Sequence, residues 1–130
     1  MDDKASVSIS GNNAAIHLPA GLTAQVKVKT NAKSTQKVAL MDRSGEVDLV
    51  FSGTGEGNTV IGEKIITPGE RFLLDAVFEY AGTDGVLKPS KLNSGGPFEV
   101  GSLNLLVVVA ENGDDTDYND TILEFSWYTR

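Results

Sequence analysis

The amino-acid sequence predicts an all-β protein with a sandwich or barrel architecture. Segments rich in β-branched residues recur about every ten residues, which is the spacing of strands in such folds. The 14 glycines and 4 prolines supply turns between these segments, and no long stretch has the 3.6-residue period of a helix. The chain has 130 residues, of which 40% are hydrophobic, so we expect residues 1–130 to form a single domain around one core.

The first half of the chain contains six expected strands, each bounded by turn residues. In the third of them Ala24, Val26 and Val28 alternate with polar residues, which predicts one buried and one solvated face. Gly53-Thr-Gly-Glu-Gly57 lacks GxGxxG spacing, so we interpret it as a mobile turn rather than a phosphate loop. The six strands are expected at Ser6 to Ser10, Ala14 to Leu18, Ala24 to Thr30, Lys37 to Asp42, Val47 to Phe51 and Thr59 to Ile66.

The second half contains three further expected strands, at Arg71 to Tyr80, Leu103 to Ala110 and Thr121 to Thr129. The second of these lacks alternation, which predicts a central strand covered on both faces. In the last strand Trp127 alternates with other apolar residues, so we place it in the core rather than on a sugar-stacking surface. Residues 81–97 are rich in Gly and Pro and are expected to form a long surface excursion.

Charge and composition exclude several classes of function. The formal net charge is −7 and no basic patch stands out, so we expect no nucleic-acid partner. Without cysteine, disulfides and thiolate metal sites are excluded. The N-terminus lacks an apolar signal region and no run approaches the roughly 18 apolar residues of a membrane span, so we expect a soluble protein without membrane insertion, cytoplasmic or exported without a standard signal peptide.

Five carboxylates fall within residues 111–120, where they repel one another unless cations are bound. Calcium takes six to eight oxygen ligands from carboxylates, amides and carbonyls, and Gly113 lets the backbone turn tightly around an ion. Five negative charges fit two adjacent calcium ions that share carboxylates better than one ion. The alternative is a solvated acidic turn. The carboxylates belong to Glu111, Asp114, Asp115, Asp117 and Asp120.

The spacing of this loop is that of a calcium site but not of an EF-hand. Asp115, Asp117 and Asn119 alternate as in the first half of an EF-hand loop. Asp120 stands where that motif needs Gly, however, and Ser126 stands where it needs the bidentate Glu.

The string Glu111-Asn-Gly-Asp-Asp-Thr-Asp-Tyr-Asn-Asp120, followed by an alternating strand with Trp127 three residues before the end, closely resembles the small bacterial calcium-dependent lectins of the LecB type. The resemblance covers most of the chain and is strongest at its end. It implies an antiparallel Greek-key β-sandwich of about nine strands. Further matching residues are Leu18-Pro19-Ala20, Thr30-Asn31, Thr35-Gln36 and Val60-Ile61-Gly62.

The resemblance also implies two calcium ions that are coordinated directly by sugar hydroxyls. One ion would be held by Glu111, Asp115, Asp117 and Asp120, and the other by Asn31, Asp117, Asn119 and Asp120. The C-terminal carboxylate of a neighbouring subunit completes the second site in that family, which implies a homodimer or homotetramer with exchanged C-termini. Arg130 would supply this carboxylate, although the family usually ends in Gly.

The sugar-contacting residues implied by the resemblance come from two segments. Asn112 and Gly113 belong to the acidic loop, and Asn112 stands where the family often has an Asp that accepts a hydrogen bond from the sugar. Ala32, Lys33 and Ser34 correspond to the specificity loop. In relatives, Ala at the first of these positions accompanies mannose preference and Ser accompanies fucose preference, so we expect mannose-type glycans to be preferred over fucose.

On the sequence alone, two hypotheses for the function remain open, and neither of them is enzymatic. Asp114 and Asp115 could be imagined as a glycosidase pair, but a metal loop would hold both ionised. His17 has no Ser or Cys partner nearby in sequence and is interpreted as structural. The first hypothesis is a calcium-dependent lectin that binds mannose or fucose. The alternative is a calcium-stabilised β-sandwich that acts as a structural or adhesion module without sugar binding.

Overall fold

The computed structural model describes residues 5–19, 21–42, 48–67, 72–82, 84–112 and 120–128. Its described residues form nine strands and no helix: β1 (Ser6–Ser10), β2 (Asn13–Leu18), β3 (Ala24–Asp42), β4 (Asp48–Ile66), β5 (Phe72–Ala81), β6 (Leu87–Pro89), β7 (Lys91–Val100), β8 (Leu103–Glu111) and β9 (Thr121–Tyr128). No helix suited to crossing a membrane occurs in this described part of the chain.

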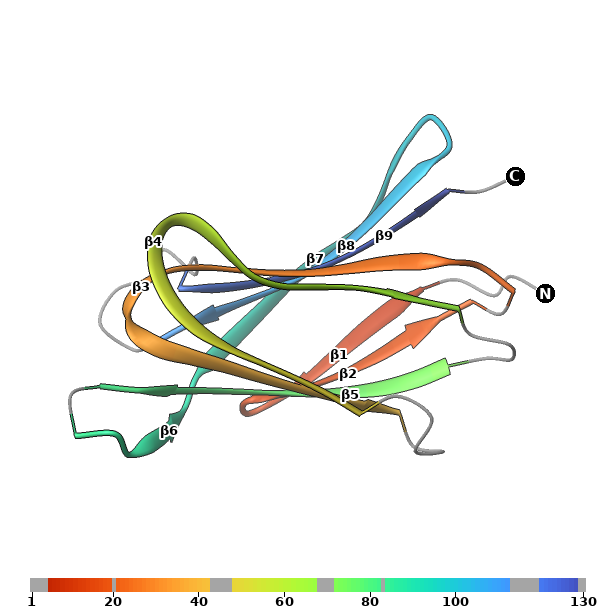
Figure 1. Ribbon diagram of the computed structural model, residues 1–130. Coiled ribbons are helices and arrows are strands. Elements are labelled where there is room, and N and C mark those ends of the chain that lie inside the picture. The colour runs from red at the N-terminus through yellow and green to blue at the C-terminus, as the bar shows by residue number, and fades with distance from the viewer. Residues whose placement is uncertain are drawn as a thin grey trace.

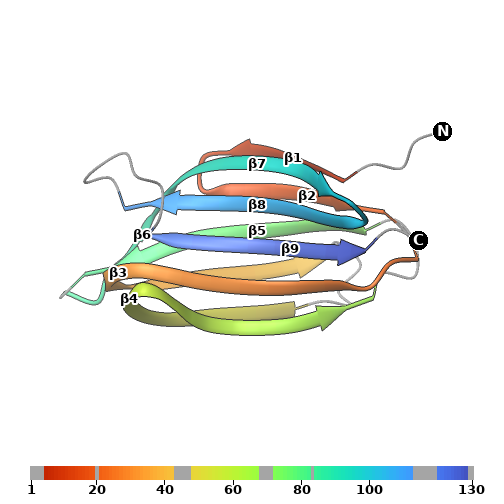
Figure 2. The same cartoon turned by 90° about the horizontal axis from the view of Figure 1, so that it is seen from above.

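The strands form two layers that are joined through the 19-residue strand β3 (Figures 1 and 2). Residues 24–30 of β3 pair with β9, whereas residues 35–42 pair with β5. The hydrogen-bonded order is β1-β2-β5-β3-β9-β8-β7, all pairs are antiparallel, β4 pairs with β3 and β6 with β5. Strands β1 and β7 approach each other on the opposite side, so the sheet nearly closes. The predicted antiparallel sandwich is therefore confirmed.

Side chains alternate in direction along the whole of β3. Ala24, Val26 and Val28 are fully buried, as expected, and burial continues at even-numbered positions to Asp42, with Ser34 half-buried. The two segments expected as separate strands at residues 24–30 and 37–42 are thus one strand. Likewise, the segments expected at residues 47–51 and 59–66 belong to the single strand β4.

The burial of β8 differs from the prediction, whereas that of β9 agrees with it. Leu106 and Val108 are fully buried, but the residues between and beside them are only half-buried, so β8 is not covered equally on both faces. It is nevertheless central, because it lies between β7 and β9. In β9, Phe125 and Trp127 point into the core with 0% and 5% exposure, which confirms the core assignment of Trp127.

The prediction of a long surface excursion at residues 81–97 is wrong, because this segment contains β6 and most of β7. Strand β7 pairs with β8 from Lys91 opposite Glu111 to Val100 opposite Leu103. Its Gly and Pro residues fall at a register shift between Gly95 and Phe98, and the strand is mostly exposed. Bulges and solvent-exposed strands tolerate such residues.

The glycine-rich stretch at residues 53–57 is part of β4, so its interpretation as a mobile turn is wrong. Here β4 bends back beside the middle of β3 (Figure 1). Gly55 has φ +150°, and a Cβ there would lie 2.6 Å from Oγ1 of Thr59. A Cβ at Gly62 would overlap the ring of Phe51. The bend therefore depends on residues without side chains.

Replacing Gly62 with alanine should destabilise the fold by about 1–3 kcal/mol, because the added methyl group must displace the Phe51 ring from a packed position. Urea unfolding of the two proteins measures this difference. Gly82→Ala is the matched control, since a Cβ at Gly82 meets no atom within 4 Å. Equal midpoints for the Gly62 and Gly82 variants would contradict the packing argument.

Candidate functional site

The middle of β3, the end of β8 and the start of β9 meet at one end of the sandwich. The backbone N–H of Asn31 donates to the carbonyl oxygen of Asp120 at 3.1 Å. The N–H of Asp120 donates in turn to the carbonyl oxygen of Ala110 at 3.1 Å, one residue before Glu111. These bonds bring Asn31 close to two predicted metal ligands from much later in the sequence, Glu111 and Asp120.

The remaining predicted site residues divide between described and undescribed segments. Ala32, Lys33 and Ser34 lie in β3 directly after Asn31, and Asn112 follows the last residue of β8. Residues 113–119 and 129–130 lie outside the described residues. Among the described residues alone, no group of three or more His, Cys, Asp or Glu side chains could hold a metal. The predicted ligands outside them are Asp115, Asp117, Asn119 and Arg130, together with Gly113.

The described donor atoms have the chemistry that calcium prefers. Glu111 is 1% exposed, and an ionised carboxylate is buried only when hydrogen bonds or cations compensate its desolvation. Oδ2 of Asp120 accepts the backbone N–H of Asn112 at 2.9 Å, which holds the carboxylate beside the end of β8. Carboxylate and amide oxygens are suitable ligands for a hard cation. Glu111, Asp120 and Asn31 therefore fit a calcium site.

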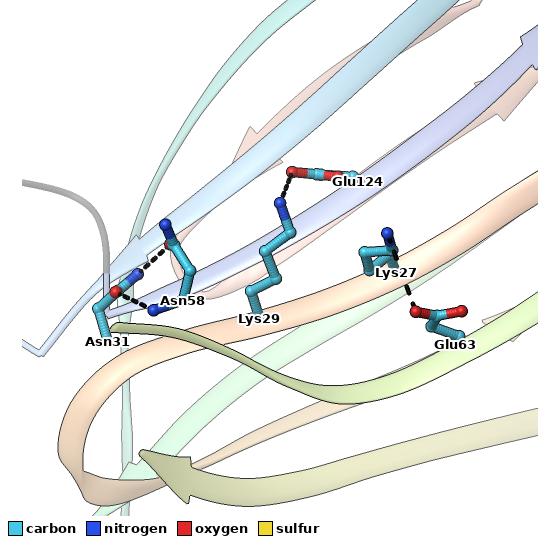
Figure 3. Close-up of polar contacts among 6 residues, drawn as sticks. All are labelled: Lys27, Lys29, Asn31, Asn58, Glu63 and Glu124. Atoms are coloured by element: carbon cyan, nitrogen blue, oxygen red, sulfur yellow. Dashed lines mark hydrogen bonds and ion pairs between the residues drawn. The ribbon is translucent and has the colours of Figure 1, made fainter. Parts of the chain in front are cut away.

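Asn31 is held by Asn58, a residue that was not predicted from the sequence. Oδ1 of Asn31 accepts the backbone N–H of Asn58 at 2.6 Å, and its Nδ2 donates to Oδ1 of Asn58 at 2.8 Å (Figure 3). Asn58 has φ +58°, a left-handed conformation that asparagine tolerates better than most residues. The Gly57-Asn58 dipeptide could have indicated this tight local backbone.

Two ion pairs lie on the same outward face of β3 as Asn31 (Figure 3). Nζ of Lys29 lies 2.9 Å from Oε1 of Glu124 on β9, and Nζ of Lys27 lies 3.8 Å from Oε1 of Glu63 on β4. Partly exposed pairs of this kind contribute about 1 kcal/mol or less each. They connect β3 to both neighbours beside the site.

The segment from Ala32 to Ser34 is fixed from the side of β4. Oγ1 of Thr54 lies 3.1 Å from the carbonyl oxygen of Ala32 and 2.7 Å from that of Lys33, so its single proton is shared between them. Ala32 is 7% exposed and Lys33 is exposed. Thr54 was also missed, because it lies in the stretch expected to be mobile.

A chain of polar side chains runs from β9 through β3 to the acidic loop. The Thr121 hydroxyl donates to Oε1 of Gln36 at 2.6 Å. Nε2 of Gln36 donates to Oγ of Ser34 at 3.0 Å, and Nδ2 of Asn112 donates to the same oxygen at 2.7 Å. Gln36 and Thr121 are 0% and 1% exposed. Oδ1 of Asn112 is buried and has no hydrogen-bond partner among the described residues.

The family model described as Fucose-binding lectin II (PA-IIL) matches residues 16–129. The chain belongs to this lectin family. The resemblance to LecB-type lectins is thus confirmed, and so is the expectation of a non-enzymatic protein, because the family and the similar structures are lectins. No curated protein sequence matches the chain.

Solved structures of lectins share this fold. A lectin of Chromobacterium violaceum, CV2L, solved in complex with alpha-methyl-fucoside, has 28% identity and a TM-score of 0.69, with 94% of this chain and 100% of that chain covered. A high-affinity mannose-binding lectin of Ralstonia solanacearum has 26% identity and a TM-score of 0.67, covering 89% and 96%. The C-terminal domain of the BC2L-C lectin of Burkholderia cenocepacia, at 22% identity and a TM-score of 0.66 over 93% and 100%, supports the fold.

Proposed function

We propose that this family member is a calcium-dependent lectin that binds mannose-type glycans in preference to fucose. The observation that carries the proposal is the convergence of Asn31, Glu111 and Asp120 at one end of the sandwich. One similar lectin was solved with a fucoside and another is described as mannose-binding, which supports a sugar of this class.

Two adjacent calcium ions would supply positive charge and exchangeable coordination positions at which vicinal sugar hydroxyls replace water. Glu111, Asp115, Asp117 and Asp120 would hold one ion. Asn31, Asp117, Asn119 and Asp120 would hold the other, together with the carboxylate of Arg130 from a neighbouring subunit. The proposed assembly is therefore a homo-oligomer, a dimer or a tetramer. The residues around the site would hold the ligand oxygens in place, as Asn58 holds the side chain of Asn31.

The remaining predicted ligand residues would contact the sugar directly. Asn112 and Gly113 belong to the acidic stretch of the sequence, and residues 32–34 belong to β3. An amide at residue 112 accepts a sugar hydroxyl without the charge assistance of the Asp common in the family. The buried Oδ1 of Asn112, which accepts no hydrogen bond from the described residues, supports this acceptor role.

Titration calorimetry with methyl mannoside tests the proposal. Binding should be measurable in calcium and absent in excess chelator. Retention on mannose-agarose with and without chelator gives an independent check. A protein that calcium stabilises but that binds neither mannoside nor fucoside would instead support the structural or adhesion module.

Ala32→Ser should shift the preference from mannose towards fucose. Ala32 lacks the hydroxyl that Ser would offer to the sugar or to the loop, and one neutral hydrogen bond contributes about 0.5–1.5 kcal/mol net. The wild-type preference for mannose should therefore be several-fold and movable by this substitution. Competition titrations with methyl mannoside and fucose measure both ratios. Thr35→Ala, at an exposed position just beyond the loop, is the control; a wild type that strongly prefers fucose would refute the assignment.

A further inference from the structure

Four polar side chains from β9, β3 and the residue that follows β8 form one connected chain of hydrogen bonds. Their order is Thr121, Gln36, Ser34 and Asn112. Gln36 occupies a fully buried position on the same face of β3 as Val38 and Leu40. Burying an amide costs free energy unless its hydrogen bonds are made, so the hydrogen bonds of Gln36 are needed at this position.

The direction of the Gln36 amide follows from its contact with the main-chain oxygen of Ser34. Its Nε2 faces Oγ of Ser34 at 3.0 Å and also the main-chain oxygen of Ser34 at 3.4 Å. A carbonyl oxygen can only accept, so the amide group facing it must be the NH2. At the other end, the Thr121 hydroxyl donates to Oε1.

This direction determines where the proton of Ser34 points. A hydroxyl oxygen has two lone pairs, and those of Ser34 accept N–H groups from Gln36 and Asn112. With the NH2 groups of both amides facing it, as in this structure, the hydroxyl meets no acceptor in either group, so the Ser34 proton points to a third group. Donors that bind an oxygen also strengthen it as a donor through its own proton.

We propose that Gln36, oriented by Thr121, is a positioning residue that makes Ser34 an obligatory hydrogen-bond donor to an oxygen of the bound sugar. The inference rests on the proposed function, because Ser34 belongs to the predicted sugar-contacting loop. Ser34 would supply the donor, while Oδ1 of Asn112, which has no partner within the described part of the chain, would supply the neighbouring acceptor. Gln36 acts through Ser34 and does not touch the ligand.

The decisive variant is Gln36→Glu, which keeps the shape of the side chain but replaces the NH2 by an acceptor. The Ser34 proton then turns inward to the new carboxylate and is lost to the sugar. We expect methyl mannoside to bind about 3- to 10-fold more weakly to the calcium-saturated protein, as for the loss of one hydrogen bond. Gln25→Glu, the same change at an exposed position of β3, should bind as wild type.

A double-mutant cycle separates positioning from general damage. Ser34→Ala should weaken binding by a similar factor, and adding Gln36→Glu to it should cause less than about a further 2-fold loss. The inference would be overturned if the double variant lost affinity by the product of the two single factors, or if Gln36→Glu bound as wild type. Either result would leave the lectin proposal intact. A wild type that binds no sugar would overturn both.

A third variant covers the case in which Gln36→Glu does not fold. Thr121→Val preserves shape but leaves Oε1 of Gln36 without its donor, and should weaken binding about 2-fold. In sugar-free protein, the side-chain NH2 resonances of Gln36 should shift in Ser34→Ala and in Thr121→Val, and remain in place in Gln25→Glu. Unmoved resonances in both variants would show that the chain of hydrogen bonds does not exist in solution.

Discussion

Asp117→Ala should abolish sugar binding while the strands still form. In the proposed site Asp117 bridges both calcium ions, so its loss removes a shared ligand from each of them. Calorimetry with methyl mannoside in saturating calcium measures the loss, and circular dichroism measures retention of the β-structure. We expect affinity to fall below detection.

Asp114→Ala is the matched control for that variant, because it removes the same charge from the same acidic stretch at a residue assigned to neither ion. Its effect on sugar affinity should be much milder. Equal binding by the two variants would mean that the assignment of ligands within residues 111–120 is wrong.

Exhaustive chelation should lower the melting temperature by about 10 °C or more. A ligand present at about a thousand times its dissociation constant stabilises the native state by about 4 kcal/mol, and 1 kcal/mol corresponds to several degrees for a domain of this size. Without metal, five carboxylates crowd one short stretch of sequence, and the first of them, Glu111, is buried. Differential scanning calorimetry before and after chelation measures the shift.

Re-addition of calcium should restore the melting temperature, whereas magnesium should restore little of it, because Mg²⁺ demands a smaller octahedral shell and releases its water reluctantly. A melting curve that chelation leaves unchanged would contradict the two-ion site. Full restoration by magnesium would contradict calcium selectivity.

Strands with strict alternation were predictable because their pattern is local. Val26 and Val28, or Phe125 and Trp127, indicate a buried face through period 2 alone. Strand β7 was missed because its Gly and Pro residues carry no such pattern, and its place is determined by pairing with β8. Long-range pairing of this kind cannot be read from a short window.

The candidate site was predictable where residue type and resemblance coincide, and not where contacts alone create a role. The structure brings Asn31 beside Asp120, as a shared site requires. Asn58 holds Asn31 from 27 residues away, and Thr121 orients Gln36 across 85. The role of Gln36 could have been suspected from the sequence, because it lies two residues before the buried Val38 and so on the same face of the strand, where a polar side chain needs a partner.

The continuous course of β3 restricts how the segment proposed to contact the sugar, residues 32–34, can be diversified. Residues 32–34 lie inside a strand whose even-numbered side chains are buried from residue 24 to residue 42, apart from the half-buried Ser34, and which pairs with β9 on one side of the segment and with β5 on the other. Inserting or deleting one residue there would turn Val38 and Leu40 outward or break one of the two pairings. New sugar specificities should therefore be reachable by libraries of substitutions at fixed length, whereas loop-length libraries should yield insoluble protein.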